Sequence, residues 1–310
     1  MSGQENALYH SGVEGTEGMT HRVLSVCGGP VSVYEAGSKQ NPAVVLLHGA
    51  MYDEARFSWD QLFPALAGRY HVLAIDTPRH GRSRPWSGML DRAKLLEILE
   101  ETFRQLELAK FSIVGLSMGG GLAIEYAARR PEQVVSMALF EPGGLGETVT
   151  GQLFTYCYIH TPGMLHLLSK RYVKQSRPQL EKTLRSLYTG TSTPTDPERL
   201  ITILQDEIRG KFESGENDMD DWQLSGIGAF RLKWNLLDII PQIQCPTLWL
   251  RGENSVLVKQ SEMERAVALA RHGGSEASLS TYPNAGHMLP LEQPEQANRA
   301  VLAFFDRTAQ

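Results

Sequence analysis

Short apolar runs alternate along this chain with segments whose apolar residues recur at helical spacing. The runs lie at residues 43–47, 71–75, 111–114, 134–139 and 247–250. Continuous apolar runs of this length are typical of parallel strands that are buried on both faces. Between the second and third runs, apolar residues recur every three or four positions, at Leu95, Leu96, Ile98, Leu99 and Phe103. The alternation predicts an α/β fold, in which right-handed βαβ units form a mostly parallel sheet with helices on both faces.

Two segments do not follow this alternation. Residues 21–36 alternate as a hairpin around Gly28, Gly29 and Pro30, and the segment from 145 to 238 reads as several helices. Prolines separate these helices, at Pro162, Pro178, Pro194 and Pro197. We therefore expect a flexible N-terminal segment at 1–20, an α/β core built from 21–144 and 239–310, and an inserted helical cap at 145–238.

Composition and charge favour a small-molecule task. With 310 residues, 42% of them hydrophobic, the chain can bury a large core, and its formal net charge of -5 suggests neither a nucleic acid nor a membrane partner. The three cysteines are far apart and lack metal-ligand spacing, which predicts free thiols and no metal site. Neither a secretory signal nor a membrane-spanning apolar run is visible, so we expect a soluble, cytoplasmic protein. The oligomeric state stays open.

The segment Gly115-Leu116-Ser117-Met118-Gly119 joins the third apolar run to a helical segment. This strand-to-helix context is the one that a nucleophile elbow requires, because the sharp turn needs glycine on both sides and exposes the serine. The following helix directs its first amides toward charge that forms at the serine. We expect Ser117 to be the nucleophile and the Met118 amide to be an oxyanion-hole donor.

Two further loops are expected at the same edge of the sheet. The run 43–47 ends in His48-Gly49-Ala50-Met51, and the Ala50 amide is the expected second oxyanion donor, with His48 organising the loop. His287 lies on a loop between the expected strand 279–282 and helix 294–305. A serine at its ordinary pKa needs a base that titrates near neutrality, and His287 is the expected base.

These motifs resemble the α/β-hydrolase superfamily. The resemblance rests on His48-Gly49, the segment DTPRHGRS at 76–83, GLSMGG at 115–120 and GHMLPLEQP at 286–294, and it extends from about Val31 to the end, outside the cap. It implies an eight-stranded, mostly parallel sheet, a serine, acid, histidine order along the chain, and no cofactor.

The acid that would complete a catalytic triad with Ser117 and His287 departs from the superfamily's pattern. Most relatives place an aspartate after the strand at 246–250, where this chain has Ser255, which cannot stabilise an imidazolium charge. Glu141 ends the run at 134–140, a position that resembles the one used by haloalkane dehalogenases and zearalenone lactonases. Because a charged residue at the end of an apolar strand is costly unless paired, we expect Glu141 to be the acid, with Glu253 as the alternative.

These groups predict hydrolysis of a carboxylic ester, lactone or thioester of a medium-sized apolar or aromatic small molecule, through an acyl-serine intermediate. One alternative is a carbon-carbon bond hydrolase of a diketone, although the enzymes that this resembles have tryptophan where this chain has Met288. Another is a non-catalytic small-molecule binder on the same fold. The expected substrate-binding residues are apolar side chains of the cap and of the two loops: Met51, Phe154, Tyr158, Trp222 and Met288.

Overall fold

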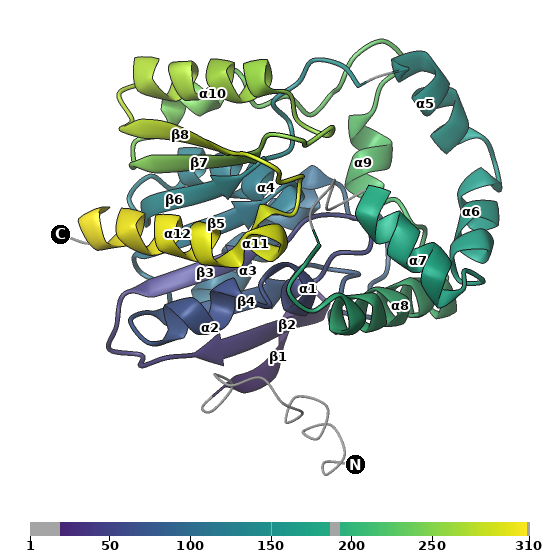
Figure 1. The fold of residues 1–310 in the computed structure, drawn as a ribbon, viewed down its shortest axis with the longest axis horizontal. Coiled ribbons are helices and arrows are strands. Elements are labelled where there is room, and N and C mark those ends of the chain that lie inside the picture. The colour runs from purple at the N-terminus through teal and green to yellow at the C-terminus, as the bar shows by residue number, and fades with distance from the viewer. Residues whose placement is uncertain (1–18, 150, 187–192, 309–310) are drawn as a thin grey trace.

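The computed structural model describes residues 19–149, 151–186 and 193–308 (Figure 1). Its centre is an eight-stranded sheet with the order β1-β2-β4-β3-β5-β6-β7-β8. The strands are β1 (Thr20–Val26), β2 (Gly29–Ala36), β3 (Ala43–Leu47), β4 (His71–Asp76), β5 (Phe111–Leu116), β6 (Val134–Phe140), β7 (Thr247–Gly252) and β8 (Ala277–Tyr282).

The pairing confirms the expected mostly parallel sheet. Strand β2 pairs antiparallel with β1 and with β4, while the pairs from β4 to β8 are parallel. Strand β3 lies between β4 and β5, with Ala43 opposite His71 on one side and Phe111 on the other. Each strand predicted from an apolar run is present, and most extend by one or two residues beyond it.

Helices cover both faces of the sheet. In β3, Val45 and Leu47 belong to one buried cluster, while Val44 and Leu46 belong to the other, as the twofold alternation of a strand requires. The first face is covered by α3 (Arg92–Gln105), α4 (Met118–Arg129), η3 (Ile240–Gln242) and α10 (Gln260–His272). The second is covered by α1 (Ala55–Ser58), α2 (Leu62–Ala67), α11 (Leu289–Glu292) and α12 (Pro294–Thr308).

The described part of the segment predicted as a cap is built mainly from helices. It contains α5 (Gln152–His160), α6 (Met164–Tyr172), α7 (Arg177–Leu184), α8 (Pro197–Glu213) and α9 (Asp221–Gly226). Figure 1 shows these helices together at one side of the sheet, at the right of the view. We call residues 145–238 the cap. Most of the segment predicted to be flexible, 1–18, lies outside the described residues.

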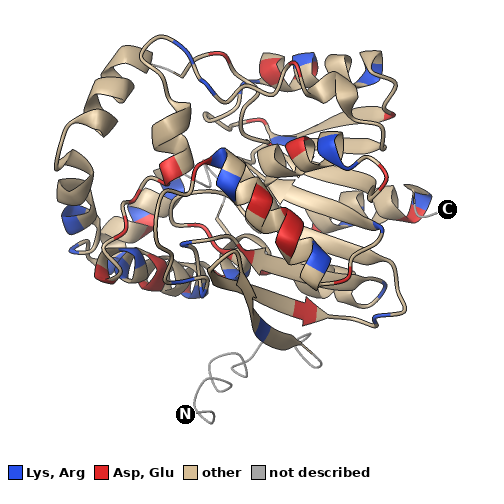
Figure 2. Cartoon of the chain, turned by 180° about the vertical axis from the view of Figure 1, so that it is seen from behind, with Lys and Arg blue, Asp and Glu red and all other residues tan. Residues whose placement is uncertain are grey.

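Acidic and basic residues are interspersed over the molecule (Figure 2). On α3, for example, Lys94 pairs with Glu97 and Arg104 pairs with Glu101. This mixing agrees with the small net charge. None of the helices in the described ranges is long and apolar enough to cross a membrane.

Candidate active site

The turn between β5 and α4 holds Ser117 in an unusual conformation, with φ 50° and ψ -114°. The backbone is crowded on both sides of this turn. A Cβ atom on Gly115 would lie 2.6 Å from the Cα of Gly120, and one on Gly119 would lie 2.1 Å from the carbonyl oxygen of Leu47. Both positions therefore require glycine, as predicted from the sequence, and the strained turn is one that surrounding packing must maintain.

The loop after β3 lies directly against this turn. The Gly119 amide donates to the His48 carbonyl (3.0 Å), and a Cβ on Gly49 would lie 3.5 Å from the Cβ of Ser117. Met118 is the first residue of α4, and Ala50 follows Gly49 in the loop. The two segments that carry the predicted oxyanion donors thus meet beside the serine, and the role of the two amides stays a prediction.

His48 is fully buried and holds the loop in place. Its Nδ1 lies 2.7 Å from the carbonyl oxygen of Gly49, and its Nε2 accepts a hydrogen bond from the Thr77 amide (3.0 Å). Burial, with a further contribution from His80, holds the pKa of His48 well below its usual value, so the ring is neutral. This arrangement fits the structural role expected for His48.

Glu141 and His287 come together from segments 146 residues apart. The His287 Nδ1 lies 2.7 Å from Glu141 Oε2, and both side chains are buried. The other carboxylate oxygen, Oε1, accepts the Gly252 amide (2.9 Å), and the Ser255 hydroxyl donates to Oε2 (2.5 Å). The carboxylate that faces the histidine is therefore Glu141. Glu253, the alternative, has an exposed side chain.

The histidine loop is braced by its neighbours. The Gly286 amide donates to both carboxylate oxygens of Glu292, at 2.9 and 2.8 Å. A Cβ on Gly252 would lie only 2.1 Å from the Gly286 carbonyl oxygen. Strand β7 can therefore approach the loop this closely only because it ends in glycine. These contacts fix the backbone on which His287 is carried.

Ser117 and His287 line the same cavity, whose volume is about 450 Å³. Its wall comes from three further segments: residues 142–149 after β6, residues 222–234 in and after α9, and residues 256–262 before and within α10. The wall includes the apolar side chains of Leu145, Trp222 and Trp234. A substrate in this cavity could reach the serine and the histidine together.

Of the residues predicted to bind substrate, Trp222 lines this cavity. The structure differs from the prediction for Phe154, whose side chain is 75% exposed and stacks on Tyr158, and for Met288, which is packed in the core. Met51 and Tyr158 are half-buried and are not among the residues of the wall. The error has a physical reason: apolar residues occur all round α5, so their spacing indicates no inward face.

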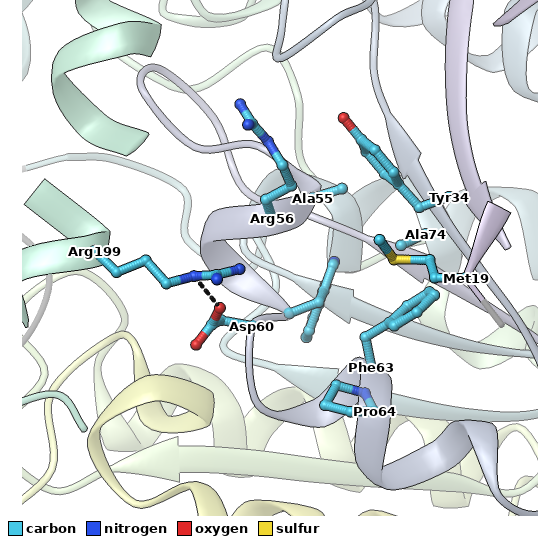
Figure 3. A pocket seen from close by; sticks show the side chains of 10 residues that line it. Met19, Tyr34, Ala55, Arg56, Asp60, Phe63, Pro64, Ala74 and Arg199 are labelled. Atoms are coloured by element: carbon cyan, nitrogen blue, oxygen red, sulfur yellow. Dashed lines mark ion pairs between the residues drawn. The ribbon is translucent and has the colours of Figure 1, made fainter. Parts of the chain in front are cut away.

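A second pocket lies elsewhere, between α1, α2 and the strands β2 and β4 (Figure 3). It has a volume of about 40 Å³, enough for a water molecule or two but not for a substrate of medium size. Figure 3 shows Arg199 of α8 reaching Asp60, with the Nε and Oδ1 atoms 2.8 Å apart. We interpret this pocket as a packing gap beside an ion pair between cap and core.

Sequence reasoning missed several contacts of the site. The bond from Ser255 to Glu141 and the bracing of the loop by Glu292 have no local sequence signal. The contribution of residues 256–262 to the cavity was also missed, together with helix α10. The helical spacing of Met263, Ala266, Val267 and Ala270 was a signal that could have revealed α10.

Several known proteins are similar to this chain, some in sequence and some in fold. Carboxylesterase YbfK of Bacillus subtilis (strain 168) is 24% identical over 278 residues, which make up 89% of this chain and 84% of that protein. A 2-hydroxy-6-oxononadienedioate/2-hydroxy-6-oxononatrienedioate hydrolase of Comamonas testosteroni is 24% identical over 273 residues, or 86% of this chain and 88% of that protein. Among solved structures, a membrane phospholipase A superposes with a TM-score of 0.75 at 24% identity, over 96% of this chain and 88% of that one.

The family model described as the alpha/beta hydrolase family matches residues 44–300. This range extends from β3 to α12 and includes the turn at Ser117, Glu141 and His287. The chain therefore belongs to the alpha/beta hydrolase family.

Proposed function

We propose that the protein is a serine hydrolase that cleaves a carboxylic ester, lactone or thioester through an acyl-Ser117 intermediate. The observation that most supports this is that His287 faces the Glu141 carboxylate through Nδ1 and lines the same cavity as Ser117. A nucleophile, a base and a group that orients the base are the components that acyl transfer requires.

The chemistry proceeds in two stages. A proton on His287 Nδ1 is held by Glu141, which leaves the Nε2 lone pair free to accept the Ser117 proton as the serine oxygen attacks the carbonyl carbon. The amides of Ala50 and Met118 stabilise the oxyanion, and the protonated histidine then donates its proton to the leaving alcohol. Water, deprotonated by His287, attacks the acyl carbon; the bond to the Ser117 oxygen breaks, His287 returns the proton to that oxygen, and the acid is released.

The cavity suits a medium-sized apolar or aromatic substrate. A volume of about 450 Å³ lies within the range of small-molecule sites, and Leu145, Trp222 and Trp234 offer apolar contact area. The relative named as a carboxylesterase supports ester cleavage.

A second candidate is hydrolysis of a carbon-carbon bond. The relative from Comamonas testosteroni, named as a 2-hydroxy-6-oxononadienedioate/2-hydroxy-6-oxononatrienedioate hydrolase, favours it. Met288 weighs against this reaction, because the carbon-carbon bond hydrolases that this chain resembles have tryptophan directly after the histidine. Ester cleavage remains the first proposal.

A fluorophosphonate probe and a series of p-nitrophenyl esters test the proposal. The parent protein should be labelled by the probe and should turn over the esters, and Ser117→Ala should lose both the labelling and the turnover. Glu253→Gln removes an exposed carboxylate and should retain both, as a control for the change in charge. An unlabelled parent that still binds small apolar molecules would instead support the non-catalytic binder. Labelling with no ester turnover, but with cleavage of a vinylogous diketone, would favour the second candidate.

A further inference from the structure

We propose that Asp220, at the start of α9 in the cap, is a positioning residue for the oxyanion loop, through its hydrogen bond to the Met51 amide. This inference rests on the proposed function, because it assigns a role to the loop that contains the Ala50 amide. It links a cap residue to the core loop beside Ser117.

The contact joins segments that are 169 residues apart. Asp220 Oδ2 accepts the Met51 amide at 3.0 Å, and the same oxygen lies 3.3 Å from His80 Nε2. Its partner oxygen, Oδ1, accepts the Lys211 ammonium group at 2.7 Å. The carboxylate thus contacts Met51, His80 and Lys211.

The Lys211 side chain is 1% exposed, although a lysine is almost never fully buried unless paired. Burial by itself would raise the pKa of Asp220, but the Lys211 ammonium group and the contact with His80 overcome it and hold the pKa well below the usual value. Asp220 is therefore a fixed anion over the working range of a hydrolase. Because a buried charge without its partner is costly, this pair holds the carboxylate in one place.

The loop 49–51 is held from both ends. Asp53 Oδ2 accepts the Gly49 amide at 2.6 Å, and Asp220 accepts the Met51 amide, so Ala50 lies between two anchored amides. Met51 has a φ of 65°, in a region that residues other than glycine rarely adopt. Such a backbone conformation persists only when its surroundings enforce it. The anchor at Asp220 enforces it.

The same residue also connects to the cavity wall. Asp220 is the N-cap of α9, where its amide donates to Gln223 Oε1 at 3.0 Å, and α9 carries Trp222 and Gln223 into the wall. Substrate contacts in the cap and the geometry of the oxyanion loop are thus connected through one side chain. Helix capping by itself would act through α9 and the cavity wall, and therefore on substrate binding, so the test must separate an effect on kcat from an effect on KM.

Variants that share one charge state remove the difference in charge from this comparison. Lys211→Met combined with Asp220→Asn removes both charges and leaves an amide oxygen that can accept the Met51 amide. Lys211→Met combined with Asp220→Ala removes the same charges and leaves no acceptor. Asp221→Asn is the neighbouring control, since Asp221 binds Arg79 (2.6 Å) and the Leu90 amide (2.9 Å), away from the loop.

We expect the variant with alanine to lose about 10- to 100-fold in kcat for p-nitrophenyl esters with KM within about threefold of the parent, because a displaced donor weakens transition-state stabilisation more than substrate binding. The variant with asparagine should recover most of this loss, and Asp221→Asn should stay close to the parent. Circular dichroism and Tm, measured for each variant, confirm that the compared proteins are folded.

Equal kcat for the alanine and asparagine variants, or a loss that appears only in KM, would overturn this inference while leaving the proposed function intact. A parent protein without turnover, or a Ser117→Ala variant as active as the parent, would overturn the proposed function and this inference with it.

Discussion

Replacing Glu141 by glutamine tests the assignment of the acid with the smallest change in shape. Glu141 Oε1 accepts the Gly252 amide, and a backbone N–H cannot become an acceptor, so the glutamine oxygen has to stay on that side. Its NH₂ group then faces His287 Nδ1, where a carboxylate oxygen now lies at 2.7 Å. Two N–H donors, the glutamine NH₂ group and the His287 Nδ1–H, would then face each other.

The histidine can relieve this conflict by moving its proton to Nε2. The nitrogen that should accept the Ser117 proton then has no free lone pair, and no carboxylate stabilises an imidazolium. The corresponding change in a serine protease lowers kcat by about 10⁴-fold. At about 1.4 kcal/mol per factor of ten, this is a loss of about 5 kcal/mol of transition-state stabilisation.

The assay compares kcat for p-nitrophenyl esters and the rate of fluorophosphonate labelling in Glu141→Gln, Glu253→Gln and the parent. We expect both rates to fall by about 10³- to 10⁴-fold in Glu141→Gln. Glu253→Gln, with the same change in charge, should stay within about twofold of the parent, as surface substitutions usually do. If Glu141→Gln were folded and kept more than a tenth of the parent activity, the reasoning about the tautomer would be wrong.

Three further outcomes follow from the same geometry. Ser255→Ala removes one hydrogen bond to Glu141 but leaves the contact with His287, so kcat should fall by about tenfold or less; a loss as large as that of Glu141→Gln would contradict this. Gly119→Ala places a Cβ 2.1 Å from a backbone oxygen and should lower the free energy of unfolding by about 3 kcal/mol or more in urea titrations, whereas a loss under about 1 kcal/mol would refute the clash. Burial raises the pKa of Glu54 from 4.5 to about 8, so the folded state binds the extra proton in this range and the free energy of unfolding should fall as pH rises from about 4.5 to 8. The expected loss, at about 1.4 kcal/mol per pKa unit, is a few kcal/mol. Urea titrations at pH 5 and pH 8 should show a larger fall in the parent than in Glu54→Gln, where the buried Asp53, with a pKa raised to about 6, still contributes; equal pH dependence in both would argue against the assignment to Glu54.

The sequence by itself determined the strands, the core helices α3, α4 and α12, and the turn at Ser117. Strands such as β3 and β5 are short apolar runs, and α3 and α4 have helical spacing, so each is encoded by residues that are close in sequence. The nucleophile elbow is local in part: the crowding at Gly115 arises within the strand-to-helix connection, whereas Gly119 is crowded by the Leu47 carbonyl of the neighbouring strand β3. The α/β class and the candidates Ser117 and His287 followed from such local patterns.

Only the tertiary structure decided which carboxylate faces His287, which groups surround that carboxylate, and which residues form the cavity wall. The bond between Glu141 and His287 and the bond between Asp220 and Met51 connect segments 146 and 169 residues apart. Such pairs depend on how strands are ordered in the sheet and how the cap folds over it, and a single sequence has no periodic signal for either. Phe154 illustrates the limit: its apolar character is visible in the sequence, but the orientation of α5 exposes it to solvent.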